Sequence, residues 1–225
     1  MRALAVGLVV LNHAGVPWLS GGYIGVDVFF VISGFLITQL LIDEAGESNS
    51  IDLRNFWARR ARRILPMSIL VTLATVVAGL FMLEPGKIRE LSAVGLGALG
   101  FCANIVLFLR TSDYLSGVTA PSSLRHFWSL AVEEQFYLLW PVVVFGAVKY
   151  GKANWKKWLV GVGVVAGAAS LITSILITKG HPGAGYYLPY SRFWEISAGA
   201  LLALAGTRFD KIPNLVRAVG GWIGL

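Results

Sequence analysis

One stretch constrains the possible folds of this chain more than any other: residues 23–42 read YIGVDVFFVISGFLITQLLI and contain a single charged side chain, Asp27. An α-helix of this length spans about 30 Å, which is the thickness of the hydrocarbon core of a bilayer. Similar apolar segments recur along the chain, in which 56% of the residues are hydrophobic and 14% are charged. Such a composition is typical of membrane proteins and argues against a soluble domain.

The apolar segments predict an all-α fold, a polytopic transmembrane helical bundle. We expect about seven complete helices, a re-entrant segment and the start of another helix. Because no hydrophilic stretch is long enough for a separate domain, we expect residues 1–225 to form a single transmembrane domain, incomplete at the C-terminus and also at the N-terminus. The chain has one cysteine, Cys102, and no cysteine pattern for a disulfide framework or a metal site.

The first predicted helix covers residues 3–16. It contains the ionisable residue His13, and a second ionisable residue, Arg2, comes directly before it. Their spacing of eleven residues is almost three turns, so both side chains lie on one face, about 16 Å apart along the axis. Ionisable residues within a membrane usually face the bundle interior or a wet cavity. A functional role for His13 is therefore favoured over the alternative, a histidine packed and hydrogen-bonded against a neighbouring helix.

A short turn at residues 17–22 predicts that the first two helices form an antiparallel hairpin, with His13 and Asp27 at similar depth. Asp27 fits a structural partner for a neighbouring donor as well as it fits a catalytic carboxylate. Further along the same helix, Gly34 follows Ser33 and permits another helix to approach closely.

The next predicted loop, residues 43–63, holds five arginines: Arg54, Arg59, Arg60, Arg62 and Arg63. This density beside a membrane span indicates the cytoplasmic side, and binding of lipid headgroups is one explanation. However, Arg60 and Arg63 are three residues apart and share a helix face. Paired guanidinium groups suit bidentate contacts with phosphate, so we expect a phosphate-bearing ligand to dock here from the cytoplasm.

Residues 92–109 are apolar but contain three closely spaced glycines, Gly95, Gly97 and Gly100. If this segment crossed the membrane, the lysine-rich segment KYGKANWKKW at residues 149–158 would lie outside. The positive-inside rule favours a segment that enters and returns, and clustered glycines fit such a re-entrant segment.

The segment HFWSLAVEEQFYLLWP at residues 126–141 places polar and aromatic side chains every three or four residues, as one stripe of a helix: His126, Ser129, Glu133, Tyr137 and Trp140. Glu134 points about 100° away from this stripe, so Glu133 is the better functional candidate. In a later segment, Arg192 and Glu195 are an i,i+3 pair, for which a local ion pair is an equally good explanation.

Five blocks occur in this order between Arg2 and Glu195: RALAVGLVVLNH, GGYIGVDVFFVISGFLI, FWARRARRILP, HFWSLAVEEQFYLLWP and SRFWE. Together they resemble the acyltransferase-3 family of bacterial integral-membrane acyltransferases. The resemblance implies a multi-pass enzyme of the bacterial inner membrane, an O-acetyltransferase. It would move an acyl group, usually acetyl from cytoplasmic acetyl-CoA, to a cell-envelope or exported carbohydrate such as O-antigen, peptidoglycan or exopolysaccharide.

The resemblance also implies roles for residues. His13 becomes the catalytic histidine and Arg2 its partner, Arg60 and Arg63 the arginine pair that handles the donor, and Glu133 the glutamate of the fourth block. Family members usually have a leader before Arg2, about ten helices, and in some cases an esterase-like domain. This chain therefore resembles a truncated membrane domain, for which a separate esterase-like partner domain is expected.

In the mechanism that we expect, the phosphates of acetyl-CoA dock on the arginine segment, which includes Arg59, and the thioester reaches His13. The neutral imidazole acts as a general base on the acceptor hydroxyl, while Asp27 or Glu133 orients the ring. Candidate acyl carriers or supporting residues are Ser33, Ser129, Tyr137, Arg192 and Glu195. The expected partners are acyl-CoA, a carbohydrate and the lipid bilayer, with neither nucleic acid nor metal.

Two other classes of protein fit part of this distribution of ionisable residues. A proton-coupled transporter also places His13, Asp27 and Glu133 in the membrane, but it needs no arginine cluster and often has inverted repeats, which are not apparent here. An inactive, truncated protein or a scaffold subunit is the other alternative.

Overall fold

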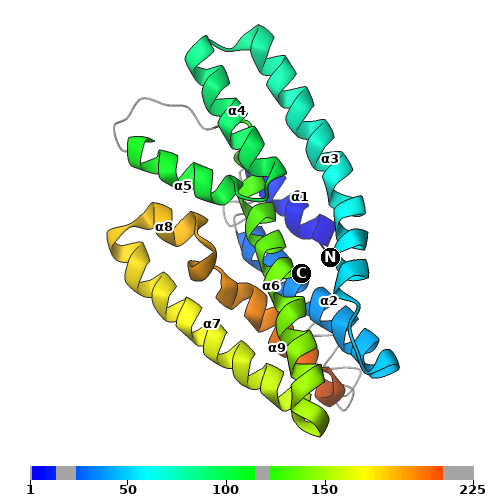
Figure 1. Ribbon diagram of the computed structural model, residues 1–225. Coiled ribbons are helices and arrows are strands. Elements are labelled where there is room, and N and C mark those ends of the chain that lie inside the picture. Colours follow the sequence, from blue (N-terminus) through cyan, green and yellow to red (C-terminus); the bar gives the residue numbers. More distant parts are fainter. Residues whose placement is uncertain (1, 14–23, 115–121, 210–225) are drawn as a thin grey trace.

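The computed structural model describes residues 2–13, 24–114 and 122–209. In these ranges the regular structure consists of helices alone, which confirms the all-α prediction (Figure 1). The α-helices are α1 (Arg2–His13), α2 (Gly25–Ser48), α3 (Leu53–Met82), α4 (Pro85–Leu99), α5 (Ala103–Tyr114), α6 (Phe127–Gly151), α7 (Trp155–Gly180), α8 (Pro182–Tyr187) and α9 (Phe193–Phe209). Short 3₁₀ turns, η2 (Lys152–Asn154) and η3 (Pro189–Ser191), precede α7 and α9. The predicted turn at 17–22 and the predicted start of a last helix lie outside the described residues.

Three described stretches are long and apolar enough to cross a membrane: Gly25–Ser48, Leu53–Met82 and Phe127–Gly180, the last of which contains both α6 and α7. The apolar part of α9, Phe193–Gly206, is shorter, and α1 has 12 residues. The prediction of a transmembrane helical bundle is therefore confirmed, although its helices differ more in length than expected.

The centre of the bundle is the contact between α2 and α9, whose backbones approach each other through two glycines. A Cβ atom on Gly34 would overlap the backbone carbonyl of Ile196, and one on Gly199 would overlap that of Val31. Residues without side chains allow this approach, which maximises van der Waals contact in a protein surrounded by lipid. The predicted close approach at Gly34 is confirmed, and its partner is α9.

The helix α3 begins eleven residues earlier than predicted, so the arginine segment is helical and not a loop. Asp52 caps α3 by accepting a hydrogen bond from the backbone N–H of Asn55 at 3.0 Å. Pro66 lies inside the helix. The prediction was wrong because hydrophobic periodicity is weak in a charged first turn, whereas an N-cap stabilises it locally.

The glycine-rich segment forms two short helices, α4 and α5, in place of one long helix. The chain turns between them at residues 100–102, where Phe101 has a positive φ of 54°. Gly97 lets the two helices pack closely, because a Cβ there would meet Val106 and Ala103. Figure 1 shows both helices in the upper half of the molecule, which agrees with the predicted re-entrant segment.

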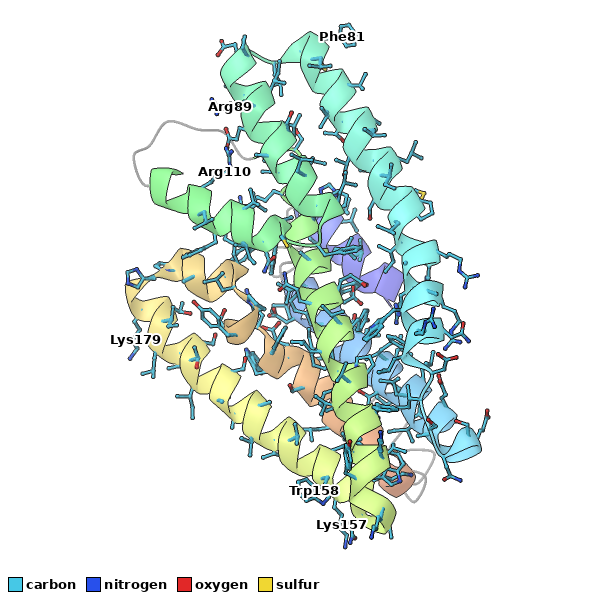
Figure 2. The ribbon with its side chains drawn as sticks, in the orientation of Figure 1. Phe81, Arg89, Arg110, Lys157, Trp158 and Lys179 are labelled. Atoms are coloured by element: carbon cyan, nitrogen blue, oxygen red, sulfur yellow. The ribbon has the colours of Figure 1, made fainter. Side chains whose placement is uncertain are left out.

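The α2–α3 and α6–α7 connections lie at the same end of the molecule, the lower end in Figure 1. We call it the basic end, because it carries the arginines of early α3 and four lysines: Lys149, Lys152, Lys156 and Lys157. In Figure 2, Lys157 lies at this end and Lys179 at the other end of α7. The fold therefore places the arginine and lysine segments on one side, as the positive-inside rule requires.

We expect Gly34→Ala to destabilise the protein, because the added methyl group meets a backbone carbonyl that cannot rotate away. Overpacking costs typically 1–3 kcal/mol, and here we expect about 3 kcal/mol or more. Gly146→Ala is the matched control, since a Cβ at Gly146 meets nothing within 4 Å. Thermal unfolding in detergent measures the difference. Equal stability of the two variants would contradict the packing of α2 against α9.

We also expect the basic end to face the cytoplasm. In a Cys102→Ala background, Arg62→Cys and Lys156→Cys should react with an impermeant thiol reagent only after the inner face is opened. Gly183→Cys, on α8, should react in intact cells. Labelling of Lys156→Cys from outside would separate the two basic segments and overturn the re-entrant arrangement of α4 and α5.

Candidate active site

The first helix carries the two residues predicted to act together in catalysis, and it forms as predicted. Arg2 and His13 are the first and last residues of α1, but their side chains lie outside the described part of the structure. A Cβ on Gly25, in the first turn of α2, would meet Ala5 and Val9. The start of α2 thus lies beside the middle of α1, one to two turns before His13, and Asp27 is not level with His13 as predicted.

Arg60 reaches from α3 to α6, where it lies over an aromatic ring of the predicted stripe. Its guanidinium carbon is 4.2 Å from the centre of the Tyr137 ring, within range of a cation–π interaction. The Tyr137 hydroxyl donates a hydrogen bond to the Glu133 carboxylate, and both residues are buried. Trp57 Nε1 donates to the Tyr137 carbonyl oxygen at 3.2 Å. Arg60, Glu133 and Tyr137 are therefore brought together, as one cluster between α3 and α6.

Arg63 lines a cavity of about 290 Å³ on the same side of α3. The cavity lies between α3 and the beginning of α6, with Arg63, Ser68 and His126 as its polar lining and apolar side chains elsewhere. Burial of the His126 ring lowers the pKa of the imidazole and so favours its neutral form. Arg60 and Arg63 both face α6, so the prediction that they share a face is confirmed.

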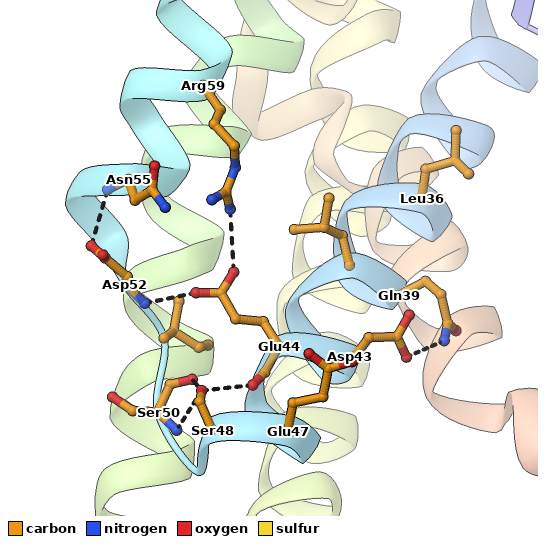
Figure 3. A pocket seen from close by; sticks show the side chains of 12 residues that line it. Leu36, Gln39, Asp43, Glu44, Glu47, Ser48, Ser50, Asp52, Asn55 and Arg59 are labelled. Atoms are coloured by element: carbon orange, nitrogen blue, oxygen red, sulfur yellow. Dashed lines mark hydrogen bonds and ion pairs between the residues drawn. The ribbon is translucent and has the colours of Figure 1, made fainter.

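Arg59 lies elsewhere, although it is adjacent to Arg60 in the sequence. Arg59 Nη2 is 3.3 Å from Glu44 Oε2, and the other oxygen of Glu44 accepts the backbone N–H of Asp52 at 2.8 Å (Figure 3). Figure 3 shows this pair at the rim of a groove lined by the acidic residues Asp43, Glu44, Glu47 and Asp52. Arg59 thus stabilises the α2–α3 connection, and the structure does not bring it together with Arg60 and Arg63.

A second cluster forms around Arg192, just before α9. Its Nη1 donates to Glu195 Oε1 at 2.7 Å and to Asp27 Oδ1 at 3.1 Å, and its Nε donates to the carbonyl oxygen of Tyr186 at 3.3 Å. Glu195 is 1% exposed. The i,i+3 ion pair is therefore present, and Asp27 is the structural partner of a donor that lies 165 residues away in the sequence.

The remaining candidates bond to their own helices. Ser33 is buried, and its hydroxyl donates to the carbonyl oxygen of Phe29 at 2.6 Å. Ser129 Oγ donates to the carbonyl oxygen of His126 at 3.3 Å. Neither hydrogen bond connects the serine to the Arg60 cluster. In the described part of the chain, no group of three or more His, Cys, Asp or Glu residues is arranged to hold a metal ion.

Sequence spacing did not indicate an aromatic cluster that packs against Arg192. Trp128 lies 4.5 Å from Tyr186 and 5.9 Å from Tyr187, measured between ring centres. The Tyr187 hydroxyl accepts a hydrogen bond from Arg125 Nε at 2.9 Å. The only sequence signal is the pair of tyrosines in the segment GHPGAGYYLPYS, which has no helical or strand period.

Comparison with known proteins gives one family and several relatives. The family model described as an acyltransferase domain, acyltransferase-3, matches residues 1–224. The peptidoglycan O-acetyltransferase OatA of Listeria monocytogenes is 34% identical over 219 residues, which are 96% of this chain and 34% of that protein. The putative peptidoglycan O-acetyltransferase YrhL of Bacillus subtilis is 33% identical over 91% of this chain and 32% of its own length.

A third relative, the O-acetyltransferase OatA of Staphylococcus aureus, is 41% identical over 144 residues, 64% of this chain and 24% of that protein. The chain thus spans about a third of the length of the Listeria and Bacillus relatives. No solved structure matches it. Because the family model covers nearly every residue, the chain belongs to the acyltransferase-3 family.

Proposed function

We propose that this chain transfers an acyl group, normally acetyl, from cytoplasmic acyl-CoA to a hydroxyl of peptidoglycan or a related cell-envelope carbohydrate. Family membership supports acyl transfer, and the names of two relatives support peptidoglycan as the acceptor. The helices suit a multi-pass location in the bacterial inner membrane. A separate esterase-like domain would be a partner in the same reaction.

The observation that carries the proposal is the arrangement of Arg60 and Arg63 along α3, both on the side that faces α6. Arg60 is held over Tyr137, and Arg63 opens into the 290 Å³ cavity. Both are near the basic end, where a cytoplasmic ligand arrives. Guanidinium groups placed in this way suit the phosphates of a nucleotide, while the mostly apolar cavity suits the acyl-bearing arm of the donor.

In the proposed reaction His13 acts as the general base. Its neutral imidazole takes the proton from the acceptor hydroxyl, and the oxygen attacks the thioester carbonyl carbon. The C–S bond then breaks, and the thiolate of CoA leaves and takes up the proton from the imidazolium. Glu133 is our candidate to stabilise that imidazolium, because it lies in the Arg60 cluster, whereas Asp27 is already bound to Arg192.

We expect the double variant Arg60→Ala/Arg63→Ala to lose CoA affinity by about 100-fold or more, since charge-assisted hydrogen bonds contribute about 1.5–3 kcal/mol each. Lysine at both positions should restore only part of the affinity, because it lacks the bidentate geometry. Arg62→Ala is the matched control: it removes the same charge from the same helix, but Arg62 bonds its own helix at the Ala58 carbonyl. Titration of the purified protein with CoA measures the affinity of each variant. Unchanged affinity in the double variant would refute donor binding at this site.

We expect His13→Gln to abolish acyl transfer without changing CoA affinity or yield, because glutamine keeps hydrogen-bonding capacity but cannot accept the proton. His181→Gln, at the end of α7, is the control and should transfer normally. The measurement is acetyl transfer to a peptidoglycan fragment per folded molecule. A packing histidine would show the reverse result: lower yield of His13→Gln, with normal turnover of the protein that folds.

A further inference from the structure

The cluster around Arg192 has an inner part and an exposed part. Inside, Arg192 is 18% exposed and bonds to α2, α8 and α9 through Asp27, Tyr186 and Glu195. Glu195 Oε2 is buried and accepts no hydrogen bond from any residue that the structure describes. The cluster thus contains one buried acceptor that no described residue satisfies.

The exposed part consists of a carboxylate and an aromatic ring. The Asp27 side chain is 39% exposed and Tyr186 is 38% exposed. Both are held by their neighbours: Asp27 by Arg192, and the Tyr186 ring by a tilted contact with the Trp128 ring and an edge contact with Tyr187, whose ring centre is 4.9 Å away. An oriented carboxylate beside a fixed ring is a suitable surface for a sugar, whose hydroxyls donate hydrogen bonds and whose C–H face is apolar.

The position of the cluster favours an external ligand. Arg192 precedes Trp194, whose backbone N–H donates to Ser170 Oγ, fifteen residues from the start of α7 and so about 22 Å along this helix from the basic end. Asp27 likewise lies at the start of α2, whereas the arginine segment follows its end. If the basic end faces the cytoplasm, as the positive-inside rule requires, Asp27 and Tyr186 lie toward the outer face, where envelope carbohydrate is found.

We propose that Asp27 and Tyr186 form a subsite for a sugar ring of the carbohydrate acceptor, with Arg192 and Glu195 as positioning residues. This inference rests on the proposed function for the identity of the ligand. The Asp27 carboxylate accepts hydrogen bonds from sugar hydroxyls, and the Tyr186 ring packs against the sugar. The hydrogen bonds of a purely structural clasp between α2 and α9 need Arg192 and both carboxylates, but they do not involve the Tyr186 ring.

The experiment measures binding of the carbohydrate with no acyl donor present. The purified full chain in detergent is titrated with a peptidoglycan tetrasaccharide, and separately with CoA. We expect Tyr186→Ala and Asp27→Asn each to weaken tetrasaccharide binding about tenfold and to change CoA affinity less than about twofold. Tyr186→Ala removes the ring, whose centre is 5.4 Å from the Arg192 guanidinium carbon, but it keeps the backbone carbonyl that binds Arg192, so the hydrogen bonds of the clasp survive. Tyr186→Phe keeps the ring and should bind like the unmodified protein.

Two control variants match the two substitutions. Tyr190→Ala removes an exposed tyrosine from the same segment, and Glu90→Gln removes a carboxylate that pairs with Arg110 at 3.7 Å between α4 and α5. Both should bind the tetrasaccharide normally. Thermal unfolding of each variant separates a loss of binding from a loss of fold, and Tyr186→Ala provides the test if Asp27→Asn is unstable.

The outcomes distinguish this inference from the proposed function. No tetrasaccharide binding by the unmodified protein, normal binding by Tyr186→Ala, or an equal loss of CoA affinity would each overturn the acceptor subsite. If CoA binds and the tetrasaccharide does not, donor binding stands and the subsite fails. If the tetrasaccharide binds as expected and CoA does not, the subsite stands and the proposed donor fails.

Discussion

The backbone contact between α2 and α9 is the constraint on which the rest of the structure depends. Within lipid, the hydrophobic effect gives little reason for two apolar helices to associate, so close packing must do so. Gly34 and Gly199 provide it, because each lies against a carbonyl of the other helix. This contact fixes how the two helices lie along each other, and thereby brings Asp27 at the start of α2 to Arg192 at the start of α9.

Local sequence patterns predicted most of the helices but few of the contacts between them. The length of apolar segments predicted α2, α3 and α6, and the spacing of Arg60 and Arg63 predicted their common face. The start of α3 was missed because its first turns are charged. The pairing of Asp27 with Arg192 was also beyond local patterns, since the choice of neighbouring helices depends on glycine contacts and loops that periodicity does not reveal.

Hydrogen bonds between buried polar groups connect the helices that form the Arg60 cluster and the Arg192 cluster. Trp140 Nε1 donates to Thr38 Oγ1 at 2.9 Å and joins α6 to α2, and Gln135 bonds both Asn104 and the Phe101 carbonyl, which joins α6 to α5. These hydrogen bonds are buried or partly buried, where an unmade bond is costly. They fix the rotation of α6, so that the side bearing Glu133 and Tyr137 faces Arg60.

The helix α6 therefore links the proposed donor and acceptor sites. Trp128, near the start of α6, packs under Arg192, whose guanidinium carbon is 5.6 Å from the centre of the Trp128 ring. Tyr137 lies under Arg60 two and a half turns later. Nine residues of helix span about 13.5 Å. Glu133 lies between these two contacts. A donor held by its phosphates at the basic end would extend its thioester along α6 toward Glu133, and an acceptor held at Asp27 would approach from the other end. In this proposal the two ligands would approach Glu133 from opposite ends of α6.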